Sequence, residues 1–459
     1  MRGLPGGLLA TAKVRAEVLR KLLRAGATGR VERLIDRLHP ADIAEMFPAL
    51  GPSEIRAVVD ILFSAHRAAR TLRELPGEVL PGILEMLDDR QIADMVERLP
   101  PDDAVSFLEV LPEERRLHVT ASLPDPQKNE LERLLAYPES TAGNRMTTRF
   151  LAVRESTTAQ EAIEAIRRHT EEEVEQIFYL YVTDDQQRLR GVVPIRKLVT
   201  CAPDRPIGEV MIPDPVSALA TADQEEVAQL AGKYNLLAVP VVDEDRRLVG
   251  VITVDDVIDV IKEEATEDMY RMVGLTEQEH IFTPLPTVIG RRLPWMVVNL
   301  ATAFLAAWVV GLFESSIRRV SVLAVFMPIV AGMGGNGGTQ TLTVITRGIA
   351  LGEIGLDAGM RAMLREVVIG TAIGVVTGIL TALCAYLWRG SAMLGLVLLL
   401  AMILNMIVAG LSGAAVPLLL RALRQDPALG SGVIVTTFTD VFGFMSFLGL
   451  ATVLIRYLA

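Results

Sequence analysis

The chain has 459 residues, of which 51% are hydrophobic, and its mean hydropathy is +0.37. It is too long for one ordinary domain and too apolar for a typical soluble enzyme, so the composition predicts a membrane protein of several domains.

Charge divides the chain into two parts. Residues 290–459 carry eleven arginines and six acidic residues, a net charge of +5, and because the whole chain carries −11, residues 1–289 carry −16. An acidic body of this size argues against nucleic acid and anionic lipid as its partners, and it is compatible with the binding of cations.

The N-terminal part, residues 1–137, is predicted to be an all-α superhelix. Its apolar residues recur at three- and four-residue spacing between prolines, as in "LHPADIAEMFPALGPSEI" and "LDDRQIADMVERLPPDDAVSFLEVLPEERR". Short helices of this kind bury their faces only by stacking. The first residues lack the apolar core and the small-residue cleavage site of a signal peptide, so we expect this part to be cytosolic.

Residues 138–262 contain two similar α/β units. Each combines a short helix such as "TAQEAIEAIRRHT" with strands such as "IFYLYVTD" or "LLAVPVV". The units resemble a tandem CBS (cystathionine-β-synthase) pair, whose modules pack face to face and often hold an adenosine nucleotide. The family's ribose-contacting Thr and Asp match Thr253 and Asp256, whereas the first unit has Pro194 and Lys197 there. The resemblance therefore implies ATP binding only at the second unit.

An acidic connecting helix is predicted next, over residues 263–292. The stretch 253–268 holds seven acidic residues against one lysine, and Asp256, Asp259, Glu263 and Glu267 share one helix face. Like charges at this spacing destabilise a helix unless a cation bridges them or water solvates them, and both alternatives stay open. Its place before the membrane part favours a sensor of ions.

A five-helix transmembrane bundle is predicted for residues 293–459. Five apolar runs each reach the roughly 20 residues that a membrane span needs; they are 293–313, 320–346, 367–388, 390–420 and 427–455. With the N-terminus inside, the cytoplasmic side carries seven arginines and the outside four, which fits the positive-inside rule and places the C-terminus outside. They are Arg291, Arg292, Arg347, Arg361, Arg365, Arg421 and Arg424 inside, and Arg318, Arg319, Arg389 and Arg456 outside.

Two of the predicted spans contain residues that are unfavourable in a lipid-facing helix. The second has "AGMGGNGGTQT", where each glycine in a helix interior costs roughly 1 kcal/mol relative to Ala. Close backbone packing or an unwound, cavity-lining segment would offset that cost, and Asn336 favours the lining. The fifth holds Asp440, and a carboxylate at that depth marks an ion pathway or, as the simpler alternative, a structural hydrogen bond to a neighbouring helix.

The sequence shows no catalytic site. Cys201 and Cys384 lie in different parts of the chain, and the five histidines lack ligand spacing for zinc. We therefore expect a protein that is not an enzyme.

The order of these features resembles the MgtE family of magnesium channels over nearly the whole chain. The motifs are "RLPWMVVNL", "FMPIVAGMGGNGGTQTLTVITRG", "DPAL" and "TFTDVFG", after a superhelix, a CBS pair and an acidic "plug" helix. The resemblance implies a homodimer in the inner membrane, with a Mg²⁺ pore lined by the second and fifth spans. It also implies that Mg²⁺ bound to acidic cytosolic domains closes the channel and that low intracellular Mg²⁺ opens it.

The matching positions define the candidate sites. For the pore they are Asp440, Asn336, Gly335, Thr436 and Gly443; for regulatory Mg²⁺ they are Asp223, Glu225, Asp256, Asp259, Glu264, Glu267, Asp268 and Asp426. Asn235 stands where the family can carry an acid, and no N-domain acid is matched. Two alternatives stay open, a proton-coupled divalent cation carrier and a nucleotide-sensing membrane regulator without transport.

Overall fold

A computed structural model describes residues 5–77, 79–168, 177–275, 279, 285–354 and 356–458 of the chain. These residues fall into two compact units, Met1–Ile261 and Lys262–Ala459. Each unit has its own hydrophobic core.

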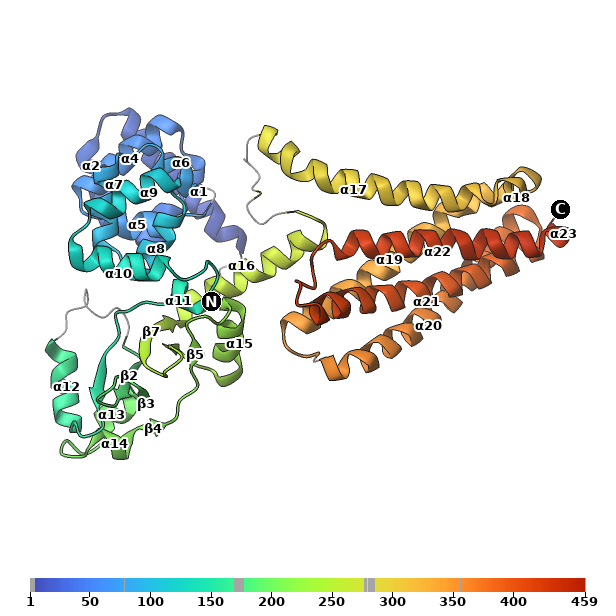
Figure 1. The fold of residues 1–459 in the computed structure, drawn as a ribbon. Coiled ribbons are helices and arrows are strands. Elements are labelled where there is room, and N and C mark those ends of the chain that lie inside the picture. Colours follow the sequence, from blue (N-terminus) through green and yellow to red (C-terminus); the bar gives the residue numbers. More distant parts are fainter. Residues whose placement is uncertain are drawn as a thin grey trace. The chain divides into compact units, whose positions relative to one another are not determined.

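Short helices stack into a superhelix at the start of the first unit, as predicted (Figure 1). They begin where the sequence offers caps: in α7 the Asp88 carboxylate accepts a hydrogen bond from the backbone N–H of Gln91, at 2.7 Å. Their apolar faces share one core, in which Leu62, Ile92 and Leu108 are fully buried. The elements are α1 (Pro5–Arg24), α2 (Thr28–Arg37), α3 (Pro40–Ala44), η1 (Phe47–Ala49), α4 (Pro52–Ser64), α5 (Ala68–Arg73), α6 (Leu80–Leu84), α7 (Asp89–Arg98), α8 (Pro101–Glu109), α9 (Glu113–Ser122), α10 (Asp125–Leu135) and α11 (Ala142–Arg145).

Arginine side chains join successive layers of this superhelix. Arg115 donates hydrogen bonds to the carbonyl oxygens of Leu84 (3.0 Å) and Leu87 (2.8 Å) and to the Asp89 carboxylate (2.9 Å). Arg67 does the same for carbonyl oxygens at the end of α2. The last carbonyl groups of a helix have no partner within it, so these guanidinium groups satisfy them across layers.

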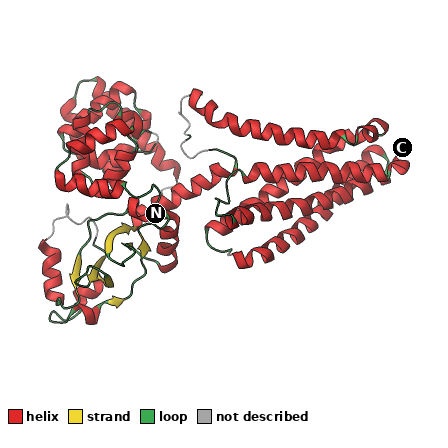
Figure 2. Cartoon of the chain, in the orientation of Figure 1, coloured by secondary structure: helices red, strands yellow, loops and turns green. Residues whose placement is uncertain are grey.

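The two α/β units follow, and strands occur only there within the described residues (Figure 2). In each, a parallel pair leads into an antiparallel one, β1‖β2 with β2–β3 and β5‖β6 with β6–β7, which confirms the internal repeat. The elements are β1 (Ala152–Arg154), α12 (Ala159–Arg168), β2 (Tyr179–Thr183), β3 (Leu189–Pro194), α13 (Ile195–Thr200), α14 (Ile207–Val210) and β4 (Ile212–Pro213), then β5 (Ala218–Leu219), α15 (Gln224–Tyr234), β6 (Ala238–Val242), β7 (Leu248–Thr253) and α16 (Val254–Met272).

One apolar cluster joins the two sheets. Tyr181 and Val192 of the first sheet pack with Ala238 and Val251 of the second. The two α/β units therefore face each other, as in the CBS pair that they resemble.

The acidic connecting helix is continuous with the second α/β unit. α16 starts at Val254, so the boundary predicted between residues 262 and 263 falls inside it. The reason is local, because no Pro or Gly interrupts Val254–Met272. Most of residues 276–284 lies outside the described part of the chain.

Five helices of the described residues are long and apolar enough to cross a membrane, which confirms the predicted spans. α21 packs against α19, α20 and α22. Gly370, Gly374 and Gly378 of α20 lie directly on the α21 backbone, a small-residue repeat that lets two membrane helices approach closely. The helices of this unit are α17 (Leu285–Gly311), α18 (Glu314–Arg319), α19 (Val322–Ala350), α20 (Leu356–Arg389), α21 (Ala392–Ala422), α22 (Ser431–Val453) and α23 (Ile455–Leu458).

Replacing Arg115 by Ala should loosen the superhelix locally. The substitution removes the Arg115 donor from the Leu87 carbonyl oxygen and one of two donors from the Leu84 carbonyl oxygen, at a cost of about 1–3 kcal/mol. Hydrogen–deuterium exchange of the intact protein should become faster in peptides covering residues 80–99. The exposed Arg90 is the matched control, since Arg90→Ala should leave that exchange unchanged; equal exchange in both variants would contradict the assignment.

Candidate functional site

Asp440 lies in the middle of α22 and is half-buried. Within the described part of the chain, no hydrogen-bond donor or cation lies close enough to the Asp440 carboxylate to pair with it. The surrounding protein affects this carboxylate only by burying it. A structural hydrogen bond to a neighbouring helix, the simpler alternative, is therefore not formed within one chain. The carboxylate is available to a cation or to water.

The neighbouring helix α19 presents a polar face outward. The helix is continuous from Val322 to Ala350, so its glycine-rich segment is not unwound. Polar side chains at helical spacing are exposed along one side of it; they are Asn336, Thr339, Gln340 and Thr343. The hydroxyl groups of Thr339 and Thr343 bond to their own helix, each at 2.9 Å. The two amides cannot be solvated by lipid tails, so this face needs water or another copy of the chain.

The opposite side of the same segment is packed. A Cβ atom on Gly337 would lie 2.6 Å from Met406 of α21, and one on Gly338 would lie 2.6 Å from Val435 of α22. Gly335 is on the border, because its Cβ would lie 4.0 Å from Thr436. The glycine run therefore serves close packing, while Asn336 and its polar neighbours form the open side.

The predicted pore residues divide accordingly. Gly335 and Thr436 lie together, and Asp440 is one turn after Thr436 on α22. Gly443 is buried against Asn405 of α21, which places it in the helix contact instead of on an open face. The third helix that covers it, α21, cannot be read from the periodicity of α22 alone.

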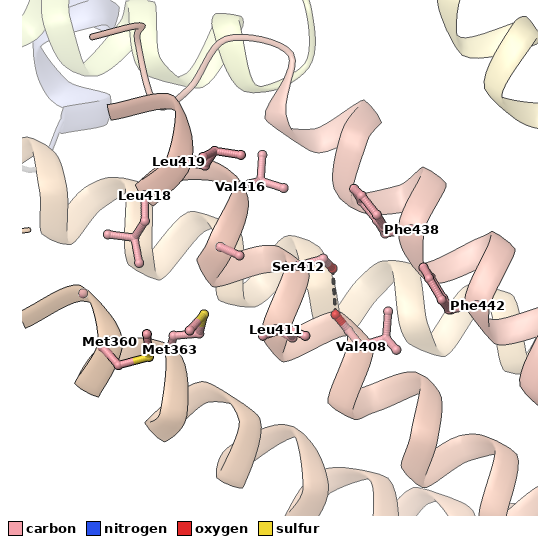
Figure 3. Close-up of a pocket in the computed structure, with 12 residues that line it drawn as sticks. Met360, Met363, Val408, Leu411, Ser412, Val416, Leu418, Leu419, Phe438 and Phe442 are labelled. Carbon is pink, nitrogen blue, oxygen red and sulfur yellow. Dashed lines mark hydrogen bonds between the residues drawn. The ribbon is translucent and has the colours of Figure 1, made fainter. Parts of the chain in front are cut away.

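An apolar groove of about 720 Å³ lies on α20, α21 and α22, and its character excludes it as an ion path (Figure 3). Its walls are aliphatic, methionine and phenylalanine side chains; Phe438 and Phe442 stack with ring centroids 6.2 Å apart. The one polar lining side chain, Ser412, donates to the Val408 carbonyl oxygen at 2.7 Å. No cation ligand is left in it.

The C-terminal end of α16 meets the start of α22 within the second unit. Arg271 forms ion pairs with Glu267 and with Asp426 of "DPAL". Its carbonyl oxygen accepts a hydrogen bond from the backbone N–H of Gly430, at 3.0 Å. The ring of Trp295, from the first half of α17, lies against Gly430. The end of the acidic helix is thus attached to the first turn of the helix that carries Asp440.

Acidic residues around this junction repel one another. The pKa of Asp268 is raised from 3.8 to about 6. Burial is the largest cause, and the Asp426 and Glu264 carboxylates add to it. Glu267 is neutralised by Arg271. The predicted regulatory acids Glu264, Asp268 and Asp426 are therefore brought together.

The other predicted regulatory acids do not form a ready-made metal site in one chain. In the described residues no group of three His, Cys, Asp or Glu could hold a metal ion. Asp223 caps α15, accepting from the Glu225 backbone N–H at 2.8 Å. Asn235 ends the same helix in the left-handed conformation (φ 52°). Asn adopts this conformation more readily than a longer acidic side chain does. Asp259 lies on α16.

The predicted nucleotide pair is also intact. The Thr253 hydroxyl lies 2.7 Å from the Asp256 carboxylate. Thr253 lines a cleft between the two sheets, beside the buried Tyr181, whose hydroxyl has no partner among the described residues. The cleft holds only about 20 Å³, so a nucleotide would have to open it.

Comparisons with known proteins match nearly the whole chain. A family model described as a divalent cation transporter, MgtE, matches residues 327–450. A model of the MgtE intracellular N domain matches residues 38–140. The CBS domain model matches twice, at residues 142–204 and 207–263. Magnesium transporter MgtE of Thermus thermophilus is 34% identical over 95% of this chain and 98% of its own length, and that of Bacillus subtilis is 32% identical over 95% and 96%. A crystal structure of the cytosolic domain of the Mg²⁺ channel MgtE with ATP matches 53% of this chain and 99% of its own, at 34% identity and a TM-score of 0.51.

Replacing Asp268 by Asn should stabilise the protein at pH 7.5 without divalent cations. Because its folded-state pKa is raised, the native state loses stability as pH rises from about 4 to about 6, and the charged form remains unfavourable above that range. The free energy of unfolding should increase by about 1 kcal/mol, a figure reduced to allow for solvent screening of the half-exposed carboxylate. The pH dependence of the free energy of unfolding between about pH 4 and about pH 6 should become smaller. Thermal unfolding in EDTA measures both; a lower melting temperature for the variant would contradict the assignment.

Proposed function

Because the chain belongs to the MgtE family of magnesium transporters, we propose that it conducts Mg²⁺ across the inner membrane through a homodimeric pore lined by α19 and α22. The observation that supports this most is the pairing of an exposed amide and hydroxyl face on α19 with the unpaired Asp440 on the adjacent α22. Both need water or a cation in a region where lipid would otherwise stand.

A two-fold axis would complete the site. One chain supplies one carboxylate, and two copies of Asp440 facing each other would repel unless a dication lay between them. Mg²⁺ holds its water shell tightly and is usually met by one or two carboxylates through retained waters. Asn336 and the carbonyl oxygens near Gly335 and Thr436 would contact those waters.

The junction of α16 and α22 supports closure by internal Mg²⁺. Asp268, Glu264 and Asp426 repel one another there, and cations among them would hold the acidic helix on the start of α22. When cytosolic Mg²⁺ falls, the repulsion returns and the junction loosens. Asp223, Glu225, Asp256, Asp259 and Glu267 would add further regulatory ligands from the cytosolic domains.

ATP is proposed as a ligand of the CBS pair at Thr253 and Asp256. The related cytosolic domain is known in complex with ATP, and the Thr–Asp pair is in place here. With the N-terminus inside, this domain and the acidic helix lie in the cytosol and the C-terminus lies outside.

A proton-coupled divalent cation carrier is the second candidate. The half-buried Asp440 could carry a proton as well as meet a cation. Flux driven by the Mg²⁺ gradient alone, with the pH gradient collapsed, separates the channel from the carrier, because a coupled carrier would stop under those conditions.

Asp440→Asn should abolish Mg²⁺ flux into proteoliposomes, down to the level of empty vesicles. The amide keeps the shape of the side chain but removes the charge that meets the dication. Ser446→Ala, on the same helix, is the matched control, since its hydroxyl only bonds to the Gly443 carbonyl oxygen at 3.1 Å. Normal flux through the folded Asp440→Asn protein would rule out the proposed pore site.

Asp426→Asn should make the channel less sensitive to internal Mg²⁺. The variant loses the ion pair with Arg271 and one carboxylate of the junction, so the half-closing Mg²⁺ concentration should rise on the order of tenfold. Patch recordings with internal Mg²⁺ varied measure this shift. Glu314→Gln, whose partner Arg318 is on its own short helix, should close like the wild type; an unshifted Asp426→Asn channel would contradict the gating role.

A further inference from the structure

Asn405 is a fully buried amide in the middle of the apolar helix α21. Its Nδ2 atom donates a hydrogen bond to the Val330 carbonyl oxygen of α19, at 2.8 Å. Its Oδ1 atom is buried and has no hydrogen-bond donor among the described residues. An aliphatic side chain would fill the same volume without burying an unpaired acceptor, so packing alone does not explain an amide here.

Two glycines make room for this amide. A Cβ atom on Gly334 of α19 would overlap it, lying 2.7 Å from its Cγ atom, and a Cβ on Gly443 of α22 would lie 2.7 Å from Nδ2. One Cα hydrogen of each glycine therefore points at the amide, whose Nδ2 atom is the nearest amide atom in both cases. The side chain from α21 thus touches α19 and α22 at the same level.

Both contacted helices carry the proposed ion ligands close to the point of contact. Asn336 is two residues after Gly334, and Asp440 is three residues before Gly443. On the other side of the contact, Gly335 approaches Thr436. The separation and the axial register of α19 and α22 at Asn405 therefore decide how Asn336 and Asp440 are placed relative to each other.

We propose that Asn405 is a positioning residue for ion conduction, which holds α19 and α22 in the register that presents Asn336 and Asp440 to the hydrated cation. A directional hydrogen bond specifies register, whereas an apolar contact tolerates sliding; single buried amides act in this way between helices of coiled coils. Two measurements test the inference. The transport measurement rests on the proposed function, whereas the measurement of the distance between α19 and α22 does not.

The distance readout uses a cysteine pair at positions 335 and 436, in the full-length protein with Cys201 and Cys384 replaced by Ser. Because a Cβ atom at position 335 would lie 4.0 Å from the Thr436 Cγ2 atom, the pair should form a disulfide on mild oxidation. In Asn405→Leu, which keeps the number and branching of side-chain heavy atoms and loses the hydrogen bond, cross-linking should slow by about three- to about twentyfold, as expected for one interhelical hydrogen bond.

Leu398→Ala is the matched control. Leu398 is also fully buried in α21, so its truncation lowers stability through a cavity and breaks no interhelical hydrogen bond. It should leave cross-linking of the 335/436 pair unchanged. Equal slowing in Leu398→Ala and Asn405→Leu would reduce Asn405 to ordinary packing and overturn the proposal.

The transport readout is the ratio of Mg²⁺ flux to Ca²⁺ flux in proteoliposomes, per folded protein. Asn405→Leu should lower this ratio severalfold, while Leu398→Ala keeps it, because a loss of folded protein reduces both fluxes equally. An unchanged ratio in Asn405→Leu would overturn the proposal. Wild-type vesicles without any Mg²⁺ flux would instead refute the proposed function and leave the cross-linking result to decide the positioning.

A double-mutant cycle covers the case in which Asn405→Leu fails to fold. Gly334→Ala places a methyl group against the amide and should separate the helices, and Asn405→Ala vacates that space. The double variant should cross-link faster than Gly334→Ala alone, so that the effects are non-additive. Additive effects would mean that the amide and the glycine do not share one contact, which would contradict the proposal.

Discussion

A carboxylate inside a membrane helix is tolerated only where water or a cation reaches it, and the membrane unit is organised around that constraint. Asp440 lies half-buried in α22 with no partner in the described chain. α17, α19 and α21 pack against this helix and cover residues such as Gly443, whereas Asp440, one turn after Thr436, stays partly open. The ion path proposed here is the consequence of that division.

Glycine makes the division possible. α19 has one face of Gly334, Gly337 and Gly338, on which α21 and α22 lie at backbone distance, and an opposite face with Asn336 and Gln340. Each glycine costs helix stability, and the close approach offsets it through van der Waals contact, which drives helix association where hydrophobic burial cannot. The packed face gives the polar face a rigid support.

In the proposed gating, α22 would also receive the signal from the cytosolic side. Arg271 at the end of α16 bonds to Asp426 and to the backbone of Gly430, where α22 begins. Burial, and then the acidic charge of Asp426 and Glu264, raises the pKa of Asp268 beside this junction to about 6. Acidic groups that repel one another without cations, beside the first turn of α22, support the proposed gating by Mg²⁺ concentration.

The sequence by itself determined the architecture: the stacked short helices, the repeated α/β units, the five spans and the one aspartate within them. These follow from periodicity and composition, which depend on near neighbours in the chain. Only the tertiary structure decided that Gly443 is covered, that α19 stays helical, that Arg271 reaches Asp426, and that Asn405 lies between two glycines. Each of these depends on which face of a helix meets another helix, and pattern along one helix does not contain that information.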